Sequence, residues 1–187
     1  MVEIRIHGRG GQGVVTAADL LAMAAFTEGH YAQAFPSFGS ERTGAPVVSY
    51  CRISDEPIRS REPVLDPDIV IVQDPTLLPV MDVFSGLKPG GLALINSTKK
   101  PEQLGDWHGI KVVTVPAGEI ARKHVGRPLP NAALLGALAA ITGQFDIKNV
   151  AEAIEQRWGG NVGKRNAEAA AEAFESIKAA HKEPANA

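Results

Sequence analysis

Four glycines near the amino terminus have the residue type and spacing best suited to ligand chemistry. Gly8, Gly10, Gly11 and Gly13 follow a short alternating apolar run and precede a stretch rich in Ala and Leu. This order predicts a strand, a tight turn and a helix. Glycine accepts positive φ and lets other atoms approach the main chain, so the turn can present bare N–H groups beside the positive end of the helix dipole. Such a turn is suited to an anion, and a tight turn without a ligand fits the pattern equally well.

The same glycines match part of the dinucleotide-binding fingerprint, but another part of it is missing. The first, second and fourth of them fit G-x-G-x-x-G after a strand. Nucleotide-binding Rossmann domains place an acid about 20 residues further on to hold the ribose. Residues 35–37 occupy that place and read Phe-Pro-Ser. Neither Arg9 nor Gln12 replaces the acid, and the Lys-Ser/Thr end of a P-loop is absent, so the sequence argues against an NAD, FAD or P-loop site.

A second candidate is the polar, glycine-bearing loop at residues 37–45, which contains Ser40, Glu41 and Arg42. The loop follows a predicted strand, and open α/β sheets bind ligands at the carboxyl ends of their strands. Arg42 is able to grip a phosphate or carboxylate with two hydrogen bonds. Glu41 is equally suited to be its ion-pair partner in an ordinary surface turn.

Asn131 follows Pro-Leu-Pro and precedes a helical pattern, so it stands where an N-cap is expected. Capping alone explains the residue, and a ligand at this helix end is the alternative. His7, at the end of the first strand, is better explained by a structural role than by ligand binding. Lys164 and Arg165 are weaker candidates, which fit an exposed helix start or a subunit contact.

The remaining polar residues show no catalytic constellation. The histidines and Cys51 have no metal-ligand spacing, and no nucleophile–base pair or acid couple can be located. On its own residues the chain therefore reads as a binding subunit rather than a complete enzyme.

Strands alternate with helices over the first two thirds of the sequence. Strands are expected at residues 2–6, 31–35, 47–53, 69–72, 92–96 and 110–116, and helices at 13–28, 76–87, 117–125, 132–142, 147–158 and 164–180. The apolar run at 69–72 is typical of a strand buried on both faces of a parallel sheet. We predict an α/β fold: an open, mostly parallel, Rossmann-like sheet with additional C-terminal helices. Residues 1–187 form one domain, with an α/β core at 1–128 and helices at 129–181.

Composition narrows the function classes. The net charge of −2 and the scattered basic residues give no footprint for nucleic acid. No apolar run is long enough to span a membrane, and the charged first strand is unlike a signal peptide, so we expect a cytoplasmic protein. The single cysteine, Cys51, lies in a strand-like run and is expected to be buried. One thiolate cannot hold an iron–sulfur cluster, so any redox centre must lie on another chain.

Taken together, the two loops carry a family resemblance. Gly-Arg-Gly-Gly-Gln-Gly at 8–13, Ser-Phe-Gly-Ser-Glu-Arg-Thr-Gly-Ala at 37–45 and Pro-Asn at 130–131 with Leu-Gly-Ala-Leu at 135–138 resemble the gamma subunit of the 2-oxoacid:ferredoxin oxidoreductases. The Ser-Glu-Arg-Thr-Gly-Ala form is most similar to the pyruvate:ferredoxin oxidoreductase branch. The resemblance spans nearly the whole chain.

This resemblance implies an enzyme complex whose isolated gamma chain is inactive. The complex would oxidatively decarboxylate pyruvate or a related 2-oxoacid with coenzyme A to acyl-CoA, CO2 and reduced ferredoxin. Thiamine diphosphate would be held by alpha and beta subunits, and 4Fe-4S clusters by beta and a ferredoxin-like delta subunit. The gamma chain would help form the coenzyme A/thiamine diphosphate cavity. Its site residues would be Gly8, Arg9, Gly10, Gly11, Gln12, Gly13, Ser40, Glu41, Arg42 and Asn131, with no catalytic residue or metal ligand of its own.

Two other functions remain open on the sequence. One is a stand-alone nucleotide-binding regulatory domain, and the other is a purely structural scaffold whose glycine turn packs against a partner.

Overall fold

A six-stranded sheet forms the centre of the computed structural model, which describes residues 1–37, 43–107 and 109–182. The strands are β1 (Val2–Arg9), β2 (Tyr31–Pro36), β3 (Pro46–Ser54), β4 (Ile69–Val72), β5 (Leu92–Asn96) and β6 (Lys111–Val115). Their order is β2-β3-β1-β4-β5-β6. Strand β3 pairs antiparallel with β1 and β2, whereas β1, β4, β5 and β6 are joined in parallel. The predicted open, mostly parallel sheet is confirmed.

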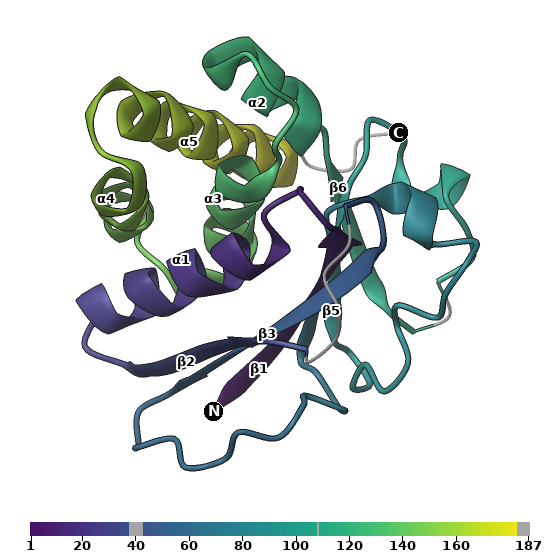
Figure 1. Ribbon diagram of the computed structural model, residues 1–187. Coiled ribbons are helices and arrows are strands. Elements are labelled where there is room, and N and C mark those ends of the chain that lie inside the picture. Colours follow the sequence, from purple (N-terminus) through teal and green to yellow (C-terminus); the bar gives the residue numbers. More distant parts are fainter. Residues whose placement is uncertain (38–42, 108, 183–187) are drawn as a thin grey trace.

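The helices gather on one face of this sheet (Figure 1). They are α1 (Val14–Thr27), α2 (Ala117–Val125), α3 (Asn131–Thr142), α4 (Ile147–Trp158) and α5 (Gly160–Lys182). Helix α3 is buried from its first residue through Ala139, because it lies among the other helices. At Gly136 its backbone lies so close to α5 that an added Cβ would stand 1.9 Å from the carbonyl oxygen of Ala170.

Strand β4 shows how the two faces of the sheet differ. Ile69 and Ile71 belong to the core beneath the helices, while Val70 and Val72 pack in a second cluster with Leu77. All four residues of the strand are buried. This alternation confirms the prediction of a strand covered on both faces. The second face is covered by the segments that join β4 to β5 and β5 to β6, which Figure 1 shows at the right.

The helix predicted at residues 76–87 is wrong. Only a short 3-10 helix forms there, η1 (Pro75–Leu77), followed by turns. Pro79 has no backbone N–H to continue a helix, and Gly86 adopts a φ of 74°. The apolar residues of this segment have helical spacing, but they pack on the second face of the sheet without forming an α-helix. None of the helices in the described ranges has the length and apolar character needed to cross a membrane.

Candidate functional site

The glycine turn leads from the carboxyl end of β1 into α1. Gly11 has a φ of 91° and Gly13 a φ of 72°, a region that favours glycine. Gly13 is the N-cap of α1, and no side chain caps this helix end. The first N–H groups of an α-helix have no intrahelical acceptor, so those of α1 are available to a ligand. The predicted strand, tight turn and helix are therefore confirmed.

A pocket of about 320 Å³ opens in front of this helix end. It is lined by Arg9, Gly10, Gly11, Gly13, Val14, Val15, Thr16 and Val47. The turn follows β1, which stands between two groups of strands: β3 and β2 lie on one side of β1, and β4, β5 and β6 lie on the other. Ligands of open α/β sheets bind at such a switch point.

The topology also explains why the glycine spacing does not indicate a dinucleotide site. Strand β3 lies between β1 and β2 and pairs with both. The end of β2 is therefore two strands, about 10 Å, from β1. Even an acid at Phe35 would not lie beside the glycine turn, as the ribose-binding acid of a Rossmann domain does.

The second loop pairs with the turn through its last residues. The Gly10 N–H donates to the Ala45 carbonyl at 2.9 Å, and the Gly44 N–H donates to the Gly10 carbonyl at 3.1 Å. Thr43 forms a parallel bridge with Gly10. The structure thus joins the two segments that the sequence singled out. Ser40, Glu41 and Arg42 lie outside the described residues, so their role stays a prediction.

Arg9 and Gln12 both contact the segment that follows β4, and Arg9 also lines the pocket. Gln12 Oε1 accepts the Arg9 backbone N–H at 2.8 Å, and Gln12 Nε2 donates to Asp74 Oδ2 at 2.8 Å. The Arg9 guanidinium lies 3.2 Å from the same carboxylate oxygen and also donates to Thr76 and to the Gly44 carbonyl. Asp74 was missed by the sequence analysis.

Asn131 does not cap α3, so the capping interpretation is wrong. Pro130 is the N-cap, and Asn131 is the first helical residue, with 5% of its surface exposed. Its Oδ1 accepts from Gln73 Nε2 at 3.1 Å. A Cβ added to Gly13 would lie 2.3 Å from Asn131 Nδ2, so this amide packs directly against the glycine turn.

Two further carboxamides, both missed from sequence, complete the edge of the sheet. Gln73 directly follows β4 and is 1% exposed, and its Oε1 finds no partner among the described residues. Asn96 ends β5 and joins the Gln73 carbonyl to the Gly118 N–H, both at 2.9 Å. The position of these residues at strand ends is the signal that would have identified them.

The other sequence candidates have structural surroundings. His7 is 4% exposed, and its Nε2 accepts from Arg5 Nε at 3.1 Å. Burial, together with the charge of Arg5, lowers the pKa of His7 to about 4. Burial, reinforced by Asp19, raises the pKa of the Cys51 thiol to about 12. Both side chains are therefore neutral at pH 7, and Cys51 is buried as predicted.

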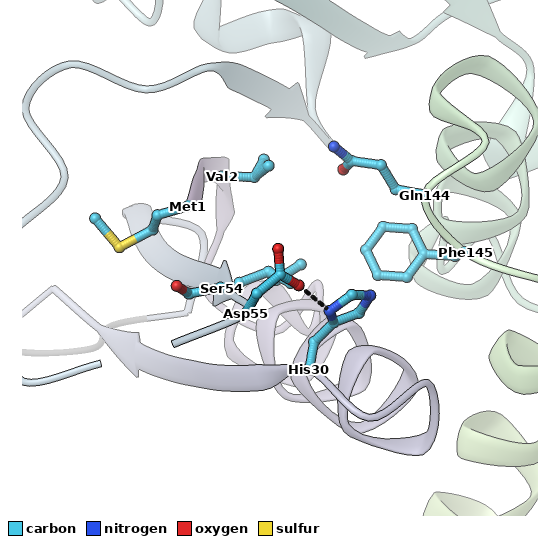
Figure 2. Close-up of a pocket in the computed structure, with 8 residues that line it drawn as sticks. Met1, Val2, His30, Ser54, Asp55, Gln144 and Phe145 are labelled. Carbon is cyan, nitrogen blue, oxygen red and sulfur yellow. Dashed lines mark hydrogen bonds and ion pairs between the residues drawn. The ribbon is translucent and has the colours of Figure 1, made fainter. Parts of the chain in front are cut away.

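A second pocket, of about 180 Å³, lies at the opposite edge of the sheet (Figure 2). Its wall includes Met1, His30, Asp55 and Phe145. His30 Nδ1 lies 2.8 Å from Asp55 Oδ1, but 90% of the Asp55 side chain is exposed, and such pairs contribute little energy. Across the ranges described, no three His, Cys, Asp or Glu side chains come together as a metal site. The glycine turn is therefore the better candidate.

Comparison with known proteins shows the family of the chain. Residues 3–176 match the family model described as pyruvate ferredoxin/flavodoxin oxidoreductase. The chain belongs to this family. The family resemblance identified in the sequence is confirmed.

Relatives in the oxidoreductase family match nearly the full chain. The common gamma subunit of the pyruvate/ketoisovalerate oxidoreductases of Thermococcus litoralis is 50% identical, over 94% of this chain and 96% of its own. Pyruvate synthase subunit PorC of Methanothermobacter thermautotrophicus is 49% identical, over 95% and 97%. The chain thus corresponds in length and sequence to the gamma-type subunit of an oxidoreductase complex.

Solved structures show the same fold. Pyruvate oxidoreductase subunit PORC of Thermotoga maritima superposes with a TM-score of 0.81 at 38% identity, covering 93% of this chain and 95% of that one. The 2-oxoglutarate:ferredoxin oxidoreductase of Magnetococcus marinus, with 2-oxoglutarate, coenzyme A and succinyl-CoA bound, gives a TM-score of 0.75 at 20% identity. That match covers 96% of this chain and 31% of the longer one.

Proposed function

We propose that the glycine turn of this gamma-type subunit forms one wall of the cavity in which the complex binds coenzyme A. In the proposed reaction, pyruvate or a related 2-oxoacid is oxidatively decarboxylated to acyl-CoA and CO2, and ferredoxin is reduced. The observation that carries the proposal is the uncapped N-terminus of α1, which opens into the pocket beside the turn.

The chemistry of this helix end fits the phosphates of coenzyme A. Unpaired N–H groups and the helix dipole together favour an anion. Gly11 presents the main chain to the pocket without a Cβ, and a Cβ added there would meet nothing within 4 Å, so phosphate oxygens can approach it closely.

The size of the pocket suits part of the coenzyme rather than all of it. Ligand pockets commonly reach about 300–1,000 Å³, and the 320 Å³ here is at the lower end. We infer that this subunit receives a phosphate-bearing portion of coenzyme A and that other chains enclose the rest. The relative solved with coenzyme A bound belongs to the same kind of oxidoreductase, which supports the choice of ligand.

The remaining parts of the proposal come from the family resemblance. Ser40, Glu41 and Arg42 would contribute to the same cavity. Thiamine diphosphate would be bound by alpha and beta partners, and 4Fe-4S clusters by beta and delta partners. The complex would work in the cytoplasm with ferredoxin as its electron acceptor.

Hydrogen exchange in the assembled complex tests the proposal. Saturating coenzyme A should slow exchange in the peptide that covers residues 8–16, and it should leave exchange at residues 53–55, in the wall of the opposite pocket, unchanged. An unchanged rate at residues 8–16, under conditions where the complex turns over, would refute the coenzyme A wall and favour a purely structural scaffold. A solitary chain that takes up NAD or ATP would instead favour the stand-alone regulatory domain.

A further inference from the structure

We propose that Asp74 is a positioning residue, which holds the glycine turn and residues 43–45, the described end of the second loop, in the shape that receives coenzyme A. The inference rests on the proposed function and deepens it. Asp74 directly follows β4 and comes from a different part of the sequence than either loop that it controls.

The Asp74 carboxylate is itself fixed by the segment after β4. Its Oδ1 accepts the Thr76 backbone N–H at 2.9 Å and the Thr76 hydroxyl at 2.6 Å. Only 12% of the Asp74 side chain is exposed. Burial raises the pKa of Asp74, but hydrogen bonds from Thr76 and Gln12 and the charge of Arg9 outweigh it, so the pKa lies below its usual range. The group is thus a carboxylate held in one orientation.

The other carboxylate oxygen controls the glycine turn through Gln12. Gln12 Nε2 donates to Asp74 Oδ2, which leaves Gln12 Oε1 aimed at the Arg9 backbone N–H. The Gln12 N–H in turn donates to the Arg9 carbonyl at 3.0 Å. Arg9 and Gln12 therefore close the turn with two reciprocal hydrogen bonds, and Asp74 sets the direction of the side chain that makes one of them.

The same oxygen reaches the second loop through Arg9. The Arg9 Nε lies 3.2 Å from Asp74 Oδ2, and its Nη1 donates to the Gly44 carbonyl at 3.1 Å. Arg9 thus joins the end of β4 to the loop that carries the predicted Ser-Glu-Arg motif. Asp74 neutralises the charge of Arg9, so Arg9 links the glycine turn to Gly44 and does not serve as a free cation. The backbone N–H groups are left to bind the phosphates.

A swap of carboxylate and carboxamide isolates this role. In Asp74→Asn the amide that replaces an oxygen opposes Gln12 Nε2, so the turn loses its anchor. Gln12→Glu alone brings a second carboxylate to the 2.8 Å contact and should also disrupt it. In the double variant, Glu at 12 accepts both from the Arg9 N–H and from Asn at 74. The contact between positions 12 and 74 is then restored with its polarity reversed, whereas the contact of Arg9 Nε with the Asp74 carboxylate stays lost.

The assembled complex is assayed for these variants. Asp74→Asn should raise the KM for coenzyme A at least fivefold, with kcat and the 2-oxoacid KM changed less than twofold. The double variant should recover the part of this loss that comes from the contact with Gln12. Without coenzyme A, residues 9–13 should exchange hydrogen faster in Asp74→Asn and return towards the wild-type rate in the swap. If Asp74→Asn does not assemble, Thr76→Val tests the same anchor with the carboxylate left in place, because it removes the hydroxyl that donates to Asp74 and accepts from Arg9.

Asp68→Asn is the matched control. Asp68 directly precedes β4 at the opposite edge of the sheet and accepts from the Glu3 N–H and from Lys88. Its substitution should therefore leave both the KM for coenzyme A and the exchange rate of residues 9–13 unchanged. Unchanged exchange at residues 9–13 in Asp74→Asn, or a double variant no better than the single, would overturn the positioning role. A third outcome is that hydrogen exchange rises in Asp74→Asn and falls again in the double variant, while the KM for coenzyme A stays constant. This would support the positioning role of Asp74 and refute the proposal that the turn binds coenzyme A.

Discussion

A negative charge placed at the start of α1 should separate ligand binding from folding. Thr16 lines the pocket and is the third residue of α1, whose first turn holds no acid. In Thr16→Glu the new carboxylate lies at the positive end of the helix dipole, where an acid stabilises the fold by about 0.3–1 kcal/mol. The same carboxylate opposes any phosphate bound at that end. The substitution should therefore strengthen the fold and weaken coenzyme A binding.

The size of the opposing effect follows from electrostatics. Two unit charges about 5 Å apart at an effective dielectric constant of about 20 repel by about 3 kcal/mol. Counter-ions and the open side of the pocket screen this interaction. We expect about 1.4 kcal/mol to remain, which corresponds to a tenfold rise in Kd.

The assay compares three forms of the assembled complex. Thr16→Glu should raise the KM for coenzyme A about tenfold, while the matched neutral variant Thr16→Gln stays within about threefold of wild type. Raising the ionic strength should narrow the difference between the two variants, because salt screens the repulsion. Thermal unfolding of the full chain should show that Thr16→Glu is at least as stable as Thr16→Gln.

A Thr16→Glu complex with unaltered KM for coenzyme A and intact stability would refute the assignment of phosphates to this helix end. Equal increases in KM for the Glu and Gln variants would show a steric effect and would refute the electrostatic argument.

Two further predictions concern the framework. Gly136→Ala should lower the free energy of unfolding by roughly 1–3 kcal/mol, because the added methyl collides with the α5 backbone at Ala170. In Gly163→Ala the added Cβ would lie 3.0 Å from Glu155 Cα, so urea titrations should show a smaller loss for this control. His7 has a folded pKa of about 4 against 6.5 unfolded, so the unfolded chain binds the extra proton and stability falls between pH 6.5 and 4, by roughly 3 kcal/mol in total. His7→Gln, which can still accept from Arg5, should lack this component, and equal pH dependence of the two proteins would contradict the buried neutral imidazole.

The sequence predicted the glycine turn because turn chemistry is local. Positive φ at Gly11 and Gly13 is a property of a few adjacent residues. The pattern at 69–72 likewise revealed burial on both faces, since it depends only on side chains within one strand. The helix at 76–87 failed because apolar residues that pack on a sheet can repeat at helical spacing by chance, and Pro79 should have been given more weight.

The rest of the candidate site depends on strand order, which local patterns do not contain. Gln73 and Asn131 are 58 residues apart, and only the position of α3 over the edge of the sheet brings them together. Asn131 has the right residue type for a cap, but the helix starts one residue earlier, and its amide is used by Gln73 instead. Insertion of β3 between β1 and β2 was equally hidden, and it is what separates this turn from a dinucleotide site.

The charges around the turn indicate how the subunit shares its work with partners. Arg9 is neutralised by Asp74, and Gln73, Asn96 and Asn131 are neutral amides, so the described edge offers dipoles in place of free cationic side chains. A helix end contributes about 0.3–1 kcal/mol toward an anion at the surface, far less than the roughly 8 kcal/mol of a micromolar site. An isolated chain should therefore bind coenzyme A weakly. On this reasoning the glycine turn orients coenzyme A, and most of the affinity comes from groups outside this edge of the sheet. A chain without a catalytic constellation of its own can then still form one wall of the coenzyme A cavity.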